Sequence, residues 1–306
     1  MRIVSILILI TLLTTFDLHA QTARSLEDYL NRAVRHIRNK EMDEALSDLN
    51  EALKLNPKYA MAYLLRADVR DTKGDKEGAL LDYNRAIELA PSTPGMEVAY
   101  NNRSVIRLAK NDIDGALEDI KNAINLNSRI AAFYNQRAII QLQKGKPDDA
   151  VSDYEKALEL NPNLPSAYYG LGSYRLKQGN FDDALADYSK AIELMPSYAD
   201  AYVSRGIARG LNSDLDKAIS NIKKGVALNV NAVSDKSRGH FTSPFIDLCQ
   251  FITSNPTNAR GYEVRGILRL IQGKATESEQ DFDKSLELDP RLKDEIDRVV
   301  KNTKAP

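Results

Sequence analysis

The stretch ALELNP at residues 157–162 closes a pattern that recurs along this chain of 306 residues. Near copies close at Pro57, Pro91, Pro196 and Pro290, and less exact copies cover residues 123–128 and 225–230. Pro57 and Pro91 lie 34 residues apart, as do the prolines at 162 and 196. A proline stops a helix and biases the residue before it toward an extended conformation. Self-similarity at such a period predicts a repeat architecture.

The residues before each proline follow a second pattern. A small residue lies twelve positions earlier, a large apolar residue follows four positions after it, and a glycine-containing turn lies further upstream. We expect two helices to cross closely at the small residues, with the large side chains filling the space beside them. The pairs are Ala45/Leu49, Ala79/Tyr83, Ala150/Tyr154 and Ala184/Tyr188, and the turn glycines are Gly74, Gly145, Gly179 and Gly273.

These units resemble tetratricopeptide repeats, with Tyr at the fourth position where Trp is common. The resemblance implies an all-α fold, a right-handed superhelix of helical hairpins. Units are expected to start at Leu26, Ala60, Glu97, Ala131, Pro165, Ala199 and Ala259. We therefore predict six consecutive units over 26–230, an insertion with a degenerate half-repeat over 231–258, a seventh unit over 259–292, and a capping helix and tail over 293–306. A shorter insertion lies around residues 92–95.

The N-terminus has the three parts of an export signal. Met1-Arg2 is positively charged, residues 3–16 carry no charge, and Leu18-His19-Ala20 places a small residue at the expected cut. We predict a signal peptide over 1–20 and a periplasmic or secreted protein. The alternative is an uncleaved membrane anchor, although the apolar run is shorter than the ~20 residues of a typical span. No cysteine lies at the cut, so a lipoprotein is not expected.

Composition narrows the function classes. Lys+Arg number 42 and Asp+Glu 43, and the charges are interleaved, so a nucleic-acid partner is not expected. Cys249 is the only cysteine, which excludes an intramolecular disulfide. Beyond the predicted signal the histidines are His36 and His240, without metal-ligand spacing or a paired nucleophile. We predict a protein that is not an enzyme and has no metal and no cofactor.

A charged pattern recurs within the units. Two arginines four apart share a helix face, and an aspartate recurs on the second helix. The arginines form either a basic stripe that binds an acidic ligand or, together with the aspartates, a series of ion pairs that holds the helices together. We favour the second arrangement and call it the structural ladder. Counting broken pairs favours a partner in the following unit for each Asp. The arginines are Arg66/Arg70, Arg103/Arg107, Arg205/Arg209 and Arg265/Arg269, and the aspartates are Asp48, Asp82, Asp119, Asp153, Asp187, Asp247 and Asp281.

The resemblance implies that a second face of each first helix lines a concave groove for extended peptides. Its amides offer a donor and an acceptor that match a peptide backbone. The candidate peptide-binding residues are Asn101, Asn102, Val105, Asn135, Gln136, Ile139, Tyr169 and Ser173. The family's carboxylate clamp is not expected: Asn102 matches it, but Leu64, Asp68, Ala132 and Gln136 replace its other residues.

These observations predict an exported scaffold, monomeric, that binds a protein or extended peptide segment on its concave face, with no membrane contact beyond the export signal. The alternatives are a self-assembling structural component of the envelope or an accessory subunit of an envelope complex. An enzyme with its chemistry in residues 231–258 is the least favoured.

Overall fold

The computed structural model describes residues 25–228 and 244–304, with side chains to residue 301. Helices joined by short turns make up these residues, and no strand occurs in them. The predicted all-α class is therefore confirmed. The predicted signal peptide and His240 lie outside the described residues. Within the described part of the chain, no helix is both long enough and apolar enough to cross a membrane.

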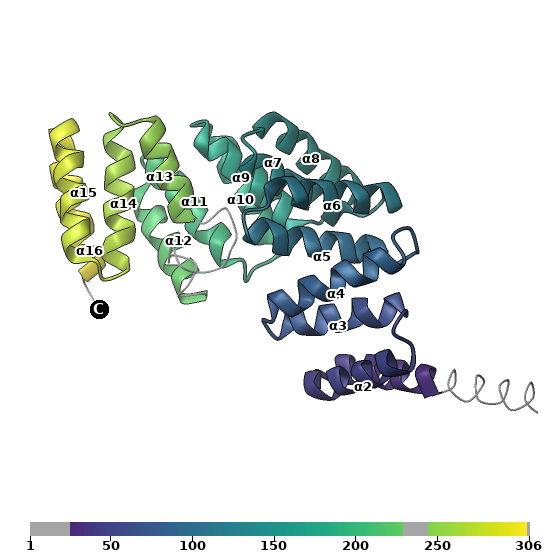
Figure 1. The fold of residues 1–306 in the computed structure, drawn as a ribbon. Helices are drawn as coiled ribbons and strands as arrows, with labels where there is room; N and C mark the ends of the chain where they lie inside the picture. Colours follow the sequence, from purple (N-terminus) through teal and green to yellow (C-terminus); the bar gives the residue numbers. More distant parts are fainter. Residues whose placement is uncertain (1–24, 229–243, 305–306) are drawn as a thin grey trace, which may run out of the picture. The chain divides into compact units, whose positions relative to one another are not determined.

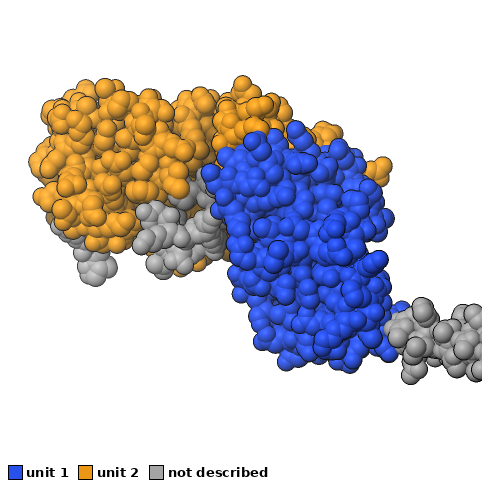
Figure 2. Space-filling model, viewed as in Figure 1, with its two compact units in different colours: residues 1–128 blue, residues 129–306 orange. Residues whose placement is uncertain are grey.

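The chain divides into two compact units, residues 1–128 and 129–306 (Figure 2). In unit 1, residues 25–39 form the first helix. Further along unit 1 lie α2 (Met42–Leu55), α3 (Ala60–Thr72), α4 (Lys76–Leu89), α5 (Met96–Ala109) and α6 (Ile113–Leu126) (Figure 1). Successive helices pair as antiparallel hairpins, so each hairpin has a first and a second helix.

Unit 2 contains four hairpins among its described residues and two further helices. The hairpins are α7 (Ala131–Gln143) with α8 (Pro147–Leu160), α9 (Pro165–Lys177) with α10 (Phe181–Leu194), α11 (Ala199–Leu211) with α12 (Leu215–Leu228), and α14 (Ala259–Ile271) with α15 (Ala275–Leu288). Helix α13 (Pro244–Ser254) precedes α14, and a 3-10 turn (Pro290–Leu292) leads into α16 (Lys293–Lys304).

Local sequence explains where the helices begin and end. Helix α8 starts with Pro147, whose missing N–H costs nothing in the first turn, and Asp148 and Asp149 follow where acidic groups favour the helix dipole. It ends before Asn161, which is extended and leads into Pro162. The turn before α4 uses Gly74 at φ +86°, a conformation that favours glycine. The recurring phrases therefore encode the hairpins directly.

The recurring alanines and tyrosines form the packed interior. Ala150 and Ala184 are fully buried, and Tyr154 is 1% exposed. The Tyr154 ring lies against Gly170 in the next hairpin, where a Cβ would come 2.3 Å from the ring. The aromatic side chain thus fills the space between successive hairpins, and a small residue opposite leaves room for it.

Helices α11 and α12 approach most closely through two glycines. A Cβ on Gly206 would lie 2.9 Å from the backbone oxygen of Ala218, and one on Gly225 would lie 2.8 Å from the backbone oxygen of Ala199. Backbone atoms cannot rotate away as a flexible side chain can. The absence of a Cβ therefore fixes the distance between these two helices.

Replacing Gly206 with alanine is expected to lower the free energy of unfolding by up to about 2 kcal/mol. Helix propensity alone would favour alanine by about 1 kcal/mol, but overpacking costs about 1–3 kcal/mol. Urea denaturation measures the change, and Ser220→Ala on the exposed side of α12 is the control that reports propensity alone. A Gly206→Ala protein as stable as the Ser220→Ala protein would contradict this close approach.

Helix α16 covers the end of unit 2. Ile296 and Val299 are buried, while its remaining described face is rich in charged residues. Arg260 on α14 forms an ion pair with α16, with its Nη1 atom 2.6 Å from Glu295 Oε2. The same nitrogen lies 2.7 Å from Oε2 of Glu263, which is also on α14. The solenoid end is thus closed by a helix with a polar outer side.

Glu263 makes the stability of this end depend on pH. Burial raises its pKa from 4.5 to about 7, although Arg260 opposes the shift. Between these values the folded chain keeps a proton that the unfolded chain releases. The group's contribution is therefore complete below about pH 4.5 and is lost as the pH rises through about 7.

We expect Glu263→Gln to remove this dependence. The unfolding free energy of the variant, relative to the parent, should rise by about 1–2 kcal/mol between about pH 4.5 and 8, allowing for solvent screening. Urea titrations at both pH values measure it, with the exposed Glu279→Gln on α15 as control. Parallel stability curves for Glu263→Gln and the parent would refute it.

Candidate functional site: the face of the first helices

The recurring charges pair inside each hairpin. An arginine of the first helix donates to the aspartate sixteen residues later, in Arg32–Asp48, Arg66–Asp82, Arg103–Asp119, Arg137–Asp153 and Arg265–Asp281. A second arginine reaches it from twelve residues before, in Arg70–Asp82, Arg107–Asp119, Arg175–Asp187 and Arg269–Asp281. The prediction that each Asp meets the Arg of the following unit is wrong, because these helix faces meet within the hairpin.

The two irregular hairpins keep part of the arrangement. Leu171 replaces the first arginine, and Asp187 pairs with Arg175 alone, with Nη1 2.6 Å from Oδ2. Asn221 replaces the aspartate and still accepts a hydrogen bond from Arg205 Nε at 2.9 Å. The hairpin therefore tolerates the loss of either partner.

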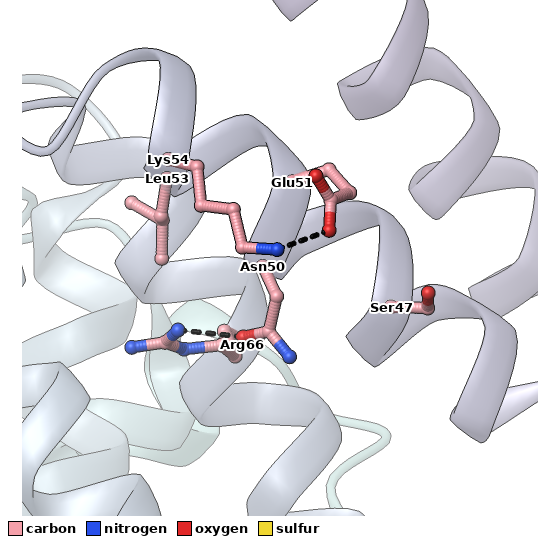
Figure 3. A pocket seen from close by; sticks show the side chains of 6 residues that line it. All are labelled: Ser47, Asn50, Glu51, Leu53, Lys54 and Arg66. Atoms are coloured by element: carbon pink, nitrogen blue, oxygen red, sulfur yellow. Dashed lines mark hydrogen bonds and ion pairs between the residues drawn. The ribbon is translucent and has the colours of Figure 1, made fainter.

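A third nitrogen of the same arginine links neighbouring hairpins. Arg66 Nη1 donates to Asn50 Oδ1 of the preceding second helix at 2.7 Å, at the edge of an open hollow also lined by Lys54 and Glu51 (Figure 3). Arg103 donates to Asn84 in the same way, at 2.8 Å. With both sides engaged, these arginines form a structural ladder rather than a free basic stripe.

The first-helix face of unit 1 carries a polar network. Asp68 on α3 accepts a hydrogen bond from the Tyr83 hydroxyl at 2.5 Å and from Asn102 Nδ2 on α5 at 3.0 Å. Asn102 Oδ1 accepts from Asn101 Nδ2 at 3.0 Å. All but Tyr83 are half-buried, and Val105, one turn further along α5, is 39% exposed. The predicted residues Asn101, Asn102 and Val105 therefore lie together on a partly open surface.

Burial shifts the pKa values of both titratable groups in this network upward. Burial raises the pKa of Asp68, while its hydrogen bonds to Tyr83 and Asn102 oppose the shift. Burial and the neighbouring Asp68 raise the pKa of the Tyr83 hydroxyl, which remains a donor. The bonds within the network already use part of the hydrogen-bonding capacity of Asn101 and Asn102.

The corresponding face of α7 in unit 2 carries Asn135, Gln136 and Ile139, all half-buried. The Oδ1 atom of Asn135 is buried and accepts no hydrogen bond from the described residues. A buried amide oxygen without a donor is costly, so it favours a donor group nearby. The binding role of Asn135, Gln136 and Ile139 stays a prediction.

Tyr169 and Ser173 have a different environment. They are 5% and 0% exposed, and their face of α9 is covered by the chain itself. Lys177, one turn further along, lies with Nζ 2.9 Å from Asp247 Oδ1 of α13, and Asp247 also interacts with the Ser173 side chain. The two residues predicted to contact a peptide are thus buried beneath α13 in this structure, and their binding role stays a prediction.

Three participants escaped the sequence prediction. Tyr83 was assigned only to packing, yet its hydroxyl joins Asp68 to Asn102. Lys177 and Asp247 are far apart in the sequence, and nothing local marks them as partners. The one available signal was the sixth recurring aspartate, Asp247, which has no arginine at the usual spacing.

Comparisons with known proteins agree with this architecture. One model described as tetratricopeptide repeat matches residues 131–164 and 165–198, and a second with that description matches 30–94. Among solved structures, pilF of Pseudomonas aeruginosa is 20% identical, with 69% of this chain and 94% of that chain covered at a TM-score of 0.58.

Two further structures reach the same TM-score of 0.58. A tetratricopeptide repeat protein of Parabacteroides merdae is 19% identical, with 92% of this chain and all of that chain covered. PilW, titled a widely conserved type IV pilus biogenesis factor, is 17% identical, with 66% of this chain and 92% of that chain covered. At these identities the likeness concerns the fold.

Proposed function

This chain belongs to the tetratricopeptide repeat family, and we propose that it is an exported scaffold that binds a protein or peptide segment on the face of its first helices. The observation that carries the proposal is the partly open surface of α3 and α5. There Asn101 and Asn102 present amide groups beside the exposed Val105. Amides with an adjacent apolar side chain suit an extended segment, which offers backbone polar groups and alternating side chains.

The structural ladder supports the same proposal, because it removes the recurring arginines from the candidates for ligand binding. Its arginines are occupied by aspartates and by the preceding helix, so the charges that recur most regularly serve folding. The first-helix face varies from hairpin to hairpin, from Leu64 and Asp68 on α3 to Asn101 and Asn102 on α5. Selective recognition by a repeat protein requires surface residues that vary between repeats while the hairpin structure stays the same.

A photo-crosslinking amino acid at Val105 tests the binding face. Incorporated into the full-length chain in its own cells, it should give at least one discrete adduct after irradiation. The same residue at Glu118, exposed on α6, should not. Identical adduct patterns at the two positions, or none at Val105, would remove the support for this face.

Export is tested separately. Cleavage after Ala20 predicts a protein outside the cytoplasm whose first residue is Gln21. Fractionation followed by N-terminal sequencing measures both properties. A chain that keeps Met1 in the cytoplasmic fraction would contradict export and leave the crosslinking result to be judged alone.

A further inference from the structure

Helix α13 has the features of a second helix but lacks a first helix to pair with among the described residues. Arg265 Nη1 on α14 lies 4.0 Å from Cys249 Sγ on α13, just as Arg66 Nη1 contacts Asn50 of the preceding second helix. Cys249 therefore occupies the position of Asn50, and Asp247 that of Asp48. Yet Asp247 takes no arginine from the described part of the chain and lies against Lys177 on α9 instead. The helix has therefore left the usual hairpin arrangement: it contacts the first helices α9, α11 and α14, and its Phe251 ring meets Phe181 at the start of α10.

Its contacts lie on the first-helix face of unit 2. Helix α13 touches α9, α11 and α14 (Figure 1, green). Tyr169, Ser173 and Lys177 follow one another at four-residue spacing, so they share one face of α9. On α11 ten of the thirteen residues are buried, against four of thirteen on α3. The first-helix face of α9 and α11 is thus covered, whereas that of α3 is partly open.

Polar groups lie among the apolar ones on the face of α9 and α11 that α13 covers. Tyr188 donates to Ser173 Oγ at 3.3 Å, and Ser204 Oγ lies 3.5 Å from the Tyr169 hydroxyl. Lys177 adds a charge. The Tyr188–Ser173 bond repeats the spacing of Tyr83–Asp68 in α3 and α4, so it is not particular to this face. Lys177 and the Ser204–Tyr169 contact are the polar features of this face that bear on recognition, because a surface that recognises a segment needs placed polar groups among apolar ones.

Helix α13 complements this surface through one stripe. Asp247, Leu248, Phe251 and Ile252 are each at most 4% exposed, and the Phe251 ring packs edge-on against Phe181 at 5.6 Å. Its other side carries Gln250, Thr253 and Ser254, which are polar. The segment is an amphipathic helix with an acidic group beside its apolar stripe, seated as a ligand helix would be.

We propose that α13 is a built-in ligand that closes the first-helix face of α9 and α11, and that a partner's amphipathic helix with the same acidic and apolar stripe replaces it. The proposal rests on the proposed binding role of the first-helix face and names the partner class for unit 2. Because α13 is part of the same chain, it competes with a partner helix at a high effective concentration. The apparent affinity for the partner is then the intrinsic affinity multiplied by the fraction of molecules in which α13 is detached.

A labelled synthetic peptide of residues 244–254, with Cys249→Ser, tests this by fluorescence anisotropy on the full chain. The parent protein should bind it weakly. Asp247→Lys repels Lys177, frees α13 and should bind it at least about tenfold more tightly. The matched control, Lys177→Glu with Asp247→Lys, restores the opposite charges and should bind as weakly as the parent.

Hydrogen exchange on the parent protein gives a readout that needs no variant. Amides of α13 should exchange faster than those of α9 and α11, because only α13 detaches. A folded Asp247→Lys protein that does not bind the peptide would overturn the proposal, as would equal protection of all three helices. A concentration-dependent dimer of the parent, seen by light scattering, would also overturn it by making a second copy the occupant. The crosslinking result at Val105 concerns unit 1 and is independent of these outcomes.

Discussion

Replacing Asp119 with alanine is expected to lower the free energy of unfolding by about 3–5 kcal/mol. The carboxylate is fully buried and accepts from Arg103 Nε at 2.8 Å and Nη2 at 2.5 Å, and Arg107 Nη1 lies 3.0 Å away. Alanine leaves two largely buried guanidinium groups without their counter-ion, and a buried unpaired charge is far more costly than an exposed one. Urea denaturation of the purified chain measures the loss.

Two controls separate the charge from general damage. Glu88→Ala breaks the exposed pair with Arg85 and should cost about 0–1 kcal/mol. Asp119→Asn should cost less than alanine, because Asn221 already shows that an amide oxygen can accept from the equivalent arginine. An alanine variant no less stable than the Glu88→Ala protein would show that the ladder does not hold the hairpin together.

Removing the Tyr188 side chain should have an effect of similar size, a loss of about 3–5 kcal/mol for Tyr188→Ala. The ring is fully buried against Gly172, where a Cβ would come 2.8 Å from the ring, and it contacts the Tyr169 ring at 5.8 Å. Alanine would leave a cavity between α9 and α10 that rigid helix backbones cannot close. The midpoint of urea denaturation reports the change.

Tyr188→Phe keeps the ring and removes only the hydroxyl that donates to Ser173. We expect it to cost about 0.5–1.5 kcal/mol, the net value of one hydrogen bond. Comparable losses for phenylalanine and alanine would mean that the polar contact, rather than the filled volume, makes this crossing stable.

The hairpins were predictable because each local signal agrees with the fold. The spacing of Ala184 and Tyr188 recurs, and a proline follows most of the second helices, so the period, the turns and the core can be read directly from the sequence. The partners of the arginines were not predictable in this way. The sequence shows that Arg103 and Asp119 recur together at a separation of sixteen residues. Counting broken pairs nevertheless pointed to the arginine of the following unit, and only the packing of the two helix faces within the hairpin identifies the partner.

The covered face of unit 2 could not have been predicted for a different reason. Tyr169 and Ser173 occupy the same positions in their helix as Asn101 and Val105 in theirs, so their local sequence gives the same expectation. Their burial depends on α13, which comes from a segment that breaks the period. Long-range docking of such a segment leaves no local pattern, whereas the first-helix face of α5 follows the period and is partly exposed.

The short insertion before α5 has a consequence for how arrays of this kind change length. It adds three residues between hairpins, with Gly95 at φ +99° turning the chain into α5. The bond from Arg103 to Asn84 nevertheless survives at a separation of nineteen residues, where Arg66 and Asn50 are sixteen apart. Stacking is thus specified by complementary surfaces and not by the length of the connecting peptide. Gene-level gains, losses or grafts of whole hairpins at this joint can therefore keep the register of the neighbours on either side.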